Sequence, residues 1–179
     1  MIYTFLADGF EEIEALAIVD ILRRAEIDIE LISVKDDITV CGAHGICVNA
    51  DKTISEIDDN YDAIFLPGGY PGYVNLSQNK KVTAILKDAF KQGRKIIAIC
   101  AAPSILGELG FLSGKEACCF TGFEEKLLGA KVTFDDVCVS DNIITSRGAG
   151  TAHSLGFALV EIFKGKKMSD SLKNTMLYK

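Results

Sequence analysis

The chain has 179 residues, of which 49% are hydrophobic and 25% are charged, and its formal net charge at pH 7 is -6. This composition is typical of one globular domain, and the acidic balance without a clustered basic face argues against a nucleic-acid-binding surface. No apolar run approaches the roughly 20 residues of a membrane-spanning helix, and the N-terminus lacks the basic and long apolar regions of a signal peptide, so we expect a cytoplasmic protein.

The first part of the chain alternates apolar strands with one amphipathic helix. We predict strands at residues 2–6, 28–34 and 61–66, a helix at 11–25 and a β-hairpin at 38–48. The predicted helix has an acidic first turn and a basic last turn, and both complement the helix macrodipole.

Two glutamates of the predicted helix lie on its apolar face. At 100° per residue, Glu11 and Glu14 share the face of Ile18 and Leu22, whereas Glu12 points away. A carboxylate on a buried stripe indicates a function, but first-turn glutamates also cap helices, and both interpretations remain open.

A loop rich in proline and glycine, residues 67–72, follows the strand at 61–66. Paired glycines let the backbone approach a ligand closely and can turn an N–H group toward an anion. An amphipathic helix is predicted next, at residues 80–91, and Gln92-Gly93 ends it.

Residues 94–103 are the segment most indicative of chemistry. The β-branched block Ile96 to Ile99 is typical of a strand buried on both faces, and Pro103 suits the first turn of a helix. Cys100 therefore falls at a strand-to-helix turn, near unpaired N–H groups and the positive end of a helix dipole. This position predicts a nucleophilic thiol with a depressed pKa; the alternative is a small buried apolar residue.

The remainder continues the alternation. A short helix should end at Gly110, and the later elements, in chain order, are a strand at 117–120, a helical segment at 124–128, a strand pair at 137–139 and 143–145, a glycine-rich loop at 145–151, a helix at 152–163 and a charged surface helix within 165–179. This order favours a doubly wound α/β fold with a mostly parallel sheet and helices on both faces. The loops after residues 6, 66, 99 and 145 would meet at one edge, which brings Glu14, Gly68-Gly69, Cys100 and Arg147 to one site.

The six cysteines, which are Cys41, Cys47, Cys100, Cys118, Cys119 and Cys138, are scattered along the chain. A domain of this length does not need disulfides, so we interpret all six as reduced thiols. Only two histidines occur, without Cys-x-x-Cys or His-x-x-x-His spacing, so no metal site is predicted.

Several motifs together resemble the DJ/ThiJ/PfpI superfamily, in particular its small single-domain branch, which includes bacterial ThiJ-like proteins and the Parkinson-disease-linked protein. They are Gly-Phe-Glu-Glu-Ile-Glu at 9–14, Val-Asp-Ile-Leu-Arg-Arg-Ala at 19–25, Leu-Pro-Gly-Gly at 66–69, Asn-Leu at 75–76, Ala-Ile-Cys-Ala-Ala-Pro at 98–103 and Thr-Ser-Arg-Gly-Ala-Gly-Thr at 145–151. The resemblance covers nearly the whole chain. It implies one domain over residues 1–179 with a flavodoxin-like fold of the class I glutamine amidotransferase type, and a homodimer.

The resemblance also implies roles for particular residues. Cys100 matches the family nucleophile, Glu14 matches the acid that hydrogen-bonds its sulfur, and the backbone of Gly69 and Ala101 borders the oxyanion pocket. An ionised Glu14 would raise the thiol pKa, so a depressed value requires that Glu14 be protonated and donate to the sulfur. Gly68, Phe120 and Arg147 are assigned to the substrate pocket. Two positions depart from the family. Ala101 stands where family proteases carry His, and Phe120 stands where many relatives place a His near the cysteine, which leaves Glu14 as the evident proton carrier.

Three functions remain in competition. The first is a glyoxalase or deglycase that needs no cofactor or metal and acts on small reactive carbonyl compounds such as methylglyoxal or glyoxal, or on glycated groups. The second is a redox-responsive stress protein or chaperone whose output is the oxidation state of Cys100. The third is an α/β domain that has lost its chemistry.

Overall fold

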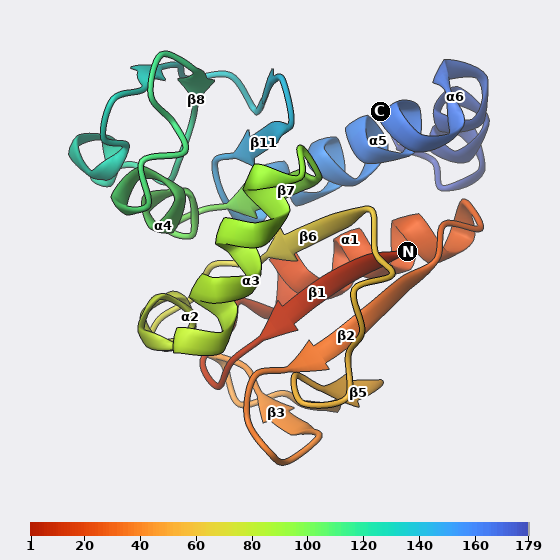
Figure 1. Ribbon diagram of the computed structural model, residues 1–179. Helices are drawn as coiled ribbons and strands as arrows, with labels where there is room; N and C mark the ends of the chain where they lie inside the picture. The colour runs from red at the N-terminus through yellow and green to blue at the C-terminus, as the bar shows by residue number, and fades with distance from the viewer. Residues whose placement is uncertain (179) are drawn as a thin grey trace.

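A seven-stranded sheet runs through the centre of the protein (Figure 1). The structure is a computed structural model and describes residues 1–178. The strand order is β10-β11-β7-β6-β1-β2-β5, and every neighbouring pair is parallel except β10 with β11. The strands are β1 (Ile2–Leu6), β2 (Ile29–Ser33), β5 (Lys52–Thr53), β6 (Ala63–Leu66), β7 (Lys95–Ile99), β10 (Val137–Ser140) and β11 (Ile143–Ser146). The predicted doubly wound, mostly parallel α/β sheet is confirmed.

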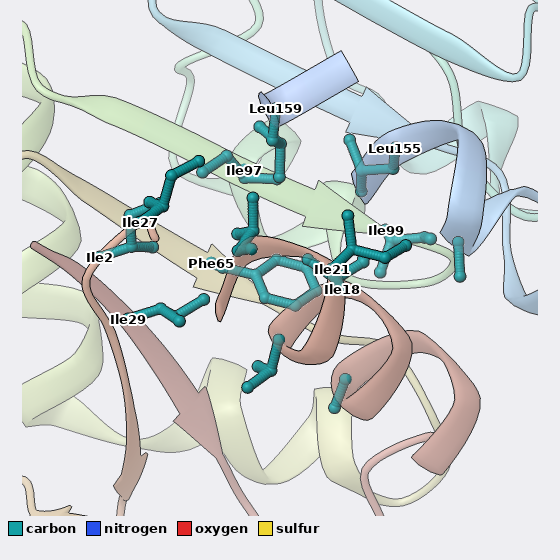
Figure 2. Close-up of a cluster of buried hydrophobic side chains, with 14 of the residues drawn as sticks. Ile2, Ile18, Ile21, Ile27, Ile29, Phe65, Ile97, Ile99, Leu155 and Leu159 are labelled. Atoms are coloured by element: carbon teal, nitrogen blue, oxygen red, sulfur yellow. The ribbon is translucent and has the colours of Figure 1, made fainter. Parts of the chain in front are cut away.

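The central strands are apolar on both faces because helices cover both. Side chains alternate along a strand, so Ile97 and Ile99 of β7 enter one hydrophobic cluster while Ile96 and Ala98 enter the other. Figure 2 shows the first cluster, in which Phe65 lies between the sheet and the helices. This continuous apolar pattern is what made β7 recognisable in the sequence.

Three helices pack on each side of the sheet. On the face of the first cluster lie α1 (Glu12–Arg24), α5 (Ala152–Lys164) and α6 (Lys166–Thr175). On the other face lie α2 (Gly72–Gln78), α3 (Lys80–Lys91) and α4 (Pro103–Glu108). No helix within residues 1–178 is long and apolar enough to cross a membrane.

Some segments differ from the predicted elements. Helix α2 was not predicted, because its first residues belong to the glycine- and proline-rich loop. The strand expected at 117–120 shortens to β8 (Glu116–Ala117), which pairs with the unpredicted β9 (Lys131–Val132), and the helical segment at 124–128 is a 3₁₀ helix, η1 (Glu124–Lys126). These short elements have too few residues to show a period.

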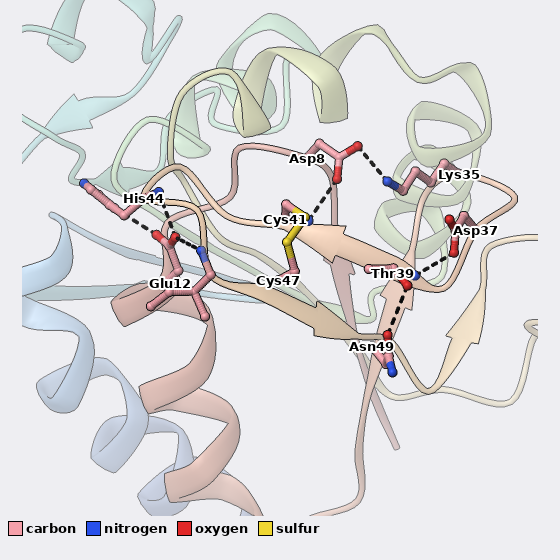
Figure 3. Close-up of a disulfide and its surroundings, with 10 residues drawn as sticks. Asp8, Glu12, Lys35, Asp37, Thr39, Cys41, His44, Cys47 and Asn49 are labelled. Atoms are coloured by element: carbon pink, nitrogen blue, oxygen red, sulfur yellow. Dashed lines mark hydrogen bonds and ion pairs between the residues drawn. A yellow bond between two sulfur atoms is a disulfide. The ribbon is translucent and has the colours of Figure 1, made fainter.

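The predicted hairpin forms a separate two-stranded sheet of β3 (Thr39–Cys41) and β4 (Cys47–Asn49). Its antiparallel register sets Cys41 opposite Cys47, and the two sulfur atoms form a disulfide (Figure 3). The interpretation of all six cysteines as reduced thiols is therefore wrong for this pair. The register, which the sequence spacing does not reveal, brings the two sulfurs together. The other four cysteines are free.

Candidate active site

Cys100 lies at the turn between β7 and α4, where the backbone takes a left-handed conformation with a φ of 65°. Such a conformation is uncommon for a residue other than glycine, and surrounding contacts must hold it. The N–H of Cys100 donates to the carbonyl oxygen of Ser146 at 3.0 Å, and its own carbonyl accepts from the N–H of Phe120 at 2.8 Å. Backbone on both sides thus fixes the thiol at the end of the strand.

Glu14 reaches this thiol from helix α1. Its side chain is buried, one carboxylate oxygen (Oε2) accepts a hydrogen bond from the N–H of Gly68 at 2.9 Å, and the carboxyl group is hydrogen-bonded to the Cys100 thiol. The side chain therefore bridges the glycine loop and the sulfur. At the start of α1, the N-cap residue Glu11 makes no side-chain capping bond.

The glycine loop approaches the pair so closely that only glycine fits. A Cβ atom added to Gly68 would lie 2.6 Å from the Cβ of Cys100 and 2.8 Å from Oε2 of Glu14. Gly69 has a φ of 94°, and a Cβ there would lie 2.3 Å from the backbone nitrogen of Glu11. Close contact requires glycine at both positions, and at Gly69 the positive φ requires it as well.

Burial sets the protonation of the pair. It raises the pKa of Glu14 to about 7. Burial, followed by the charge of Glu14 and its hydrogen bond, raises the pKa of Cys100 to about 12, although the N–H groups of Ala101 and Gly69 act in the opposite direction. The depressed thiol pKa predicted from the sequence is therefore wrong, because desolvation and the carboxylate outweigh these N–H groups. Near neutral pH the thiol keeps its proton, and the adjacent carboxylate can accept it.

A cavity of about 200 Å³ opens at the sulfur. Its lining residues are Gly69, Tyr70, Tyr73, Cys100, Ala101, Phe120 and Phe123. The rings of Tyr73 and Phe123 meet edge to face with 5.5 Å between their centroids. A cavity of this size, walled by aromatic rings, fits a small molecule.

Arg147 lies beyond Phe120, outside this cavity. Its side chain lines a second hollow, which shares Phe120 with the first. The loop after Arg147 returns to the site, since a Cβ on Gly148 would lie 3.3 Å from the Phe120 ring and 3.8 Å from Oε1 of Glu14. The structure therefore brings six of the seven predicted residues together around the sulfur, namely Glu14, Gly68, Gly69, Cys100, Ala101 and Phe120, and sets the Arg147 side chain next to them.

One buried contact near the site was missed. Glu12, which helical counting directs away from the apolar face, is 5% exposed, and its carboxylate accepts from the His44 N–H at 2.7 Å and from the His44 ring at 2.9 Å (Figure 3). Burial acts to raise the pKa of Glu12, but these hydrogen bonds lower it; the same contact raises the pKa of His44. Helical periodicity fails here because the hairpin turn covers the second face of α1.

Within residues 1–178, one group of side chains could hold a metal ion. It consists of Glu11, Glu12 and His44, whose ligand atoms lie within 4.8 Å of one another. No metal site was predicted from the sequence. Because the His44 ring is already hydrogen-bonded to Glu12, we assign this group the structural role of fastening the hairpin to α1.

Comparisons with known proteins agree on one family. The model of the DJ-1/PfpI family matches residues 1–162. The chain is 37% identical over 176 residues to the protein DJ-1 homolog A of Arabidopsis thaliana, covering 96% of this chain but 45% of the relative, so it spans about half the length of that protein. It is 32% identical over 165 residues to a glutathione-independent glyoxalase of Caenorhabditis elegans, covering 90% of this chain and 87% of that protein.

Two further matches cover most of this chain and most of the matched protein. A deglycase of Pyrococcus abyssi is 32% identical over 162 residues, covering 88% of this chain and 96% of the relative. The structure of oxidized DJ-1 from Toxoplasma gondii superimposes with a TM-score of 0.94 at 36% identity, covering 99% of this chain and 97% of that chain. The flavodoxin-like arrangement of sheet and helices is thus common to this chain and its structural relatives.

Proposed function

The chain belongs to the DJ-1/PfpI family, and from this premise we propose that it is a cofactor-independent enzyme of the glyoxalase or deglycase type. Its substrates are methylglyoxal, glyoxal or the adducts they form on other molecules. The observation that carries the proposal is the contact between a buried Glu14 and the Cys100 thiol beside a small aromatic cavity. The family includes proteins named as a glyoxalase and a deglycase.

In the first step, the sulfur of Cys100 attacks the aldehyde carbon of methylglyoxal. The carbon–sulfur bond forms while the thiol proton passes to Glu14, whose raised pKa of about 7 suits a group that accepts and returns a proton near neutral pH. The carbonyl electron pair becomes an alkoxide, to which the N–H groups of Gly69 and Ala101, beside the sulfur, donate. Glu14 returns its proton to the alkoxide, which gives a hemithioacetal and leaves the carboxylate ionised for the next step.

In the second step, Glu14 moves a proton within the substrate. It removes the hydrogen from the carbon bonded to sulfur and delivers it to the neighbouring ketone carbon through an enediol. The former aldehyde carbon is oxidised to a thioester while the ketone carbon is reduced to an alcohol, so the electrons balance within one molecule. Water then hydrolyses the thioester, which releases lactate and restores the Cys100 thiol.

A redox role for Cys100 is the second candidate. The specific observation in its favour is the similarity to the T. gondii structure, which is of an oxidized protein. Here the output would be an oxidised sulfur, and carbonyl compounds would form no more than one adduct per chain.

Steady-state lactate formation from methylglyoxal tests the proposal. We expect many lactate molecules per chain, and we expect Cys100→Ser to abolish turnover while the circular dichroism spectrum stays unchanged. A single equivalent of adduct without turnover would favour the redox role. Equal turnover by wild type and Cys100→Ser would contradict the proposed nucleophile.

A further inference from the structure

Arg147 differs from the other arginines of the chain in its charge partners. The sequence has four arginines, and three form ion pairs, namely Arg23 with Asp51, Arg24 with Asp20 and Arg94 with Asp59. Within residues 1–178, no carboxylate pairs with Arg147. In a protein with a net charge of -6, an arginine without a counter-ion beside the candidate site calls for a functional explanation.

Neutral contacts hold the Arg147 side chain in place. Its Nη2 donates to the hydroxyl of Thr121 at 3.2 Å, and its Cζ lies 5.8 Å from the centre of the Phe134 ring. Its Nε is buried and has no hydrogen-bond partner among the described residues. The guanidinium group is therefore positioned and partly desolvated, while its charge is not offset.

The group lines a hollow of about 300 Å³, together with Phe120, Thr121 and residues 148–151. No acidic or second basic side chain of the described residues lines this hollow. Phe120, 50% exposed, is the shared wall between this hollow and the Cys100 cavity.

We infer that Arg147 binds a carboxylate of the substrate whose carbonyl group reacts at Cys100. The inference rests on the proposed function and adds a preference within its substrate class, for 2-oxoaldehydes that carry a carboxylate a few carbons from the carbonyl. The hollow holds one positive charge, that of the guanidinium group, and no lysine, so it suits the single negative charge of a carboxylate. The parallel N–H donors of the guanidinium group also fit the two oxygens of a carboxylate. Phe120 supports the carbon chain that links the two groups.

A suitable substrate is 4,5-dioxopentanoate, which is a 2-oxoaldehyde with a carboxylate at the far end. The reaction adds one water and yields 2-hydroxyglutarate. The aldehyde carbon is oxidised to a carboxylate, the adjacent ketone carbon is reduced to an alcohol, and the distal carboxylate is unchanged. The neutral counterpart is 2-oxopentanal, in which a methyl group replaces that carboxylate.

The first measurement is the ratio of kcat/KM for 4,5-dioxopentanoate to that for 2-oxopentanal. Hydrogen bonds to a charged group contribute enough free energy that we expect Arg147→Gln to lower this ratio by at least about tenfold, mainly through the KM of the anionic substrate. Arg147→Lys keeps the charge without the fork and should give an intermediate ratio. Arg24→Gln makes the same change in net charge at a distant exposed ion pair and serves as the control.

The second measurement does not need turnover. Calorimetry compares the affinities of 2-hydroxyglutarate and 2-hydroxypentanoate for wild type, Arg147→Gln and Arg147→Lys, each checked for folding by circular dichroism. We expect wild type to prefer 2-hydroxyglutarate and Arg147→Gln to lose that preference. If Arg147→Gln does not fold, the comparison of wild type with Arg147→Lys decides.

The outcomes separate the two proposals. Turnover of both aldehydes with a ratio that no Arg147 variant changes would overturn the carboxylate site and leave the proposed function standing. An Arg147-dependent binding preference without any turnover would support the carboxylate site and overturn the proposed function. A wild type that neither turns over nor binds the anionic compound better than the neutral one would overturn both.

Discussion

Burial and the neighbouring Glu14 carboxyl group together set the protonation of Cys100. Glu14 is buried beside the sulfur, and its pKa of about 7 leaves it divided between two protonation states near neutral pH. The pKa of Cys100 is raised to about 12, so the resting sulfur carries a proton. In the proposed mechanism the nucleophile is therefore activated at the moment of attack, by proton transfer to Glu14, and not by a standing thiolate.

The pH dependence of turnover follows from this arrangement. Only the ionised form of Glu14 can accept the thiol proton, and burial raises its pKa to about 7. We expect kcat/KM for methylglyoxal to rise with pH up to about 7 and to level off above it, since the rate tracks the ionised fraction. A profile that falls as pH rises through 7 would show that the protonated carboxyl group is the required form.

A substitution at Gly68 tests the close contact between the glycine loop and Cys100. Because a Cβ at this position would overlap Cys100 and Glu14, we expect Gly68→Ala to lower turnover by at least about a hundredfold, as loss of the proton carrier would. Gly93→Ala is the control, since Gly93 has a φ of 70° but no atom within 4 Å of an added Cβ. It should cost about 1 kcal/mol of stability and leave turnover intact. Equal turnover in the two variants would contradict the close approach.

For single residues, the sequence predicted which side chains come together at Cys100 better than it predicted their electrostatics. The positions of Cys100 and Glu14 follow from strand and helix periods. Their pKa values depend on burial depth and on one interatomic contact, which a linear pattern does not contain. The edge of the sheet at which Arg147 lies was predicted correctly. The direction of its side chain depends on Thr121 and Phe134, which lie in irregular segments.

Among the elements, the β3–β4 hairpin is held at its turn in two ways. The Cys41–Cys47 disulfide closes it covalently, and Glu12 accepts hydrogen bonds from His44 in the turn. The hairpin also touches the loop that leads into α1, because the Cys41 carbonyl accepts from the N–H of Gly9 at 2.7 Å. The entry of the helix that carries Glu14 is thus packed against a cross-linked element.

Removal of the disulfide should destabilise the fold without touching the nucleophile. The two cysteines are six residues apart, and closure of so short a loop contributes about 2 kcal/mol. The double variant Cys41→Ser/Cys47→Ser should lose about that much free energy of unfolding. Dithiothreitol should lower the Tm of wild type toward that of the variant and leave the variant unchanged. A wild-type Tm that does not respond to the reductant would indicate that the pair is not cross-linked.

Long periodic elements were predicted well from the sequence, and short ones were not. Helix α3 begins and ends at the predicted residues, because Asn79 caps its first turn and its apolar spacing is regular. The two-residue strand β5 was not predicted, and it belongs to the sheet only through its pairing with β2. Tertiary pairing, and not local preference, decides such segments.

For the whole molecule, the layered fold gathers distant loops but leaves apolar side chains exposed on α1 and the hairpin. Ile13 is 54% exposed and Ile46 is 55% exposed. The two residues belong to segments in contact, because Glu12, which precedes Ile13 in the chain, accepts a hydrogen bond from the Ile46 N–H at 3.4 Å. We propose that this surface pairs with its copy in a homodimer with an isologous interface.

Light scattering tests the dimer. We expect a mass of twice 19.4 kDa at micromolar concentration, and we expect Ile13→Asp to shift the protein toward the monomer by burying a charge at the interface. Leu128→Asp is the matched control, because Leu128 is also 55% exposed but lies in the segment after η1. A wild-type mass of 19.4 kDa would contradict the proposal.

We propose that Glu14 carries the proton for chemistry at Cys100, and the decisive measurement is the rate of lactate formation from methylglyoxal by Glu14→Gln and Glu11→Gln. Glutamine keeps the size and hydrogen-bonding capacity of the side chain but cannot carry a proton through a cycle, so Glu14→Gln should fall by at least about a hundredfold. Glu11, at the same end of the helix but without a hydrogen bond to the sulfur, should tolerate the change to within about threefold, because general acid-base catalysis does not pass through it. Loss of activity in Glu11→Gln with retention in Glu14→Gln would contradict the account, and full activity in both would mean that neither carboxylate moves the proton.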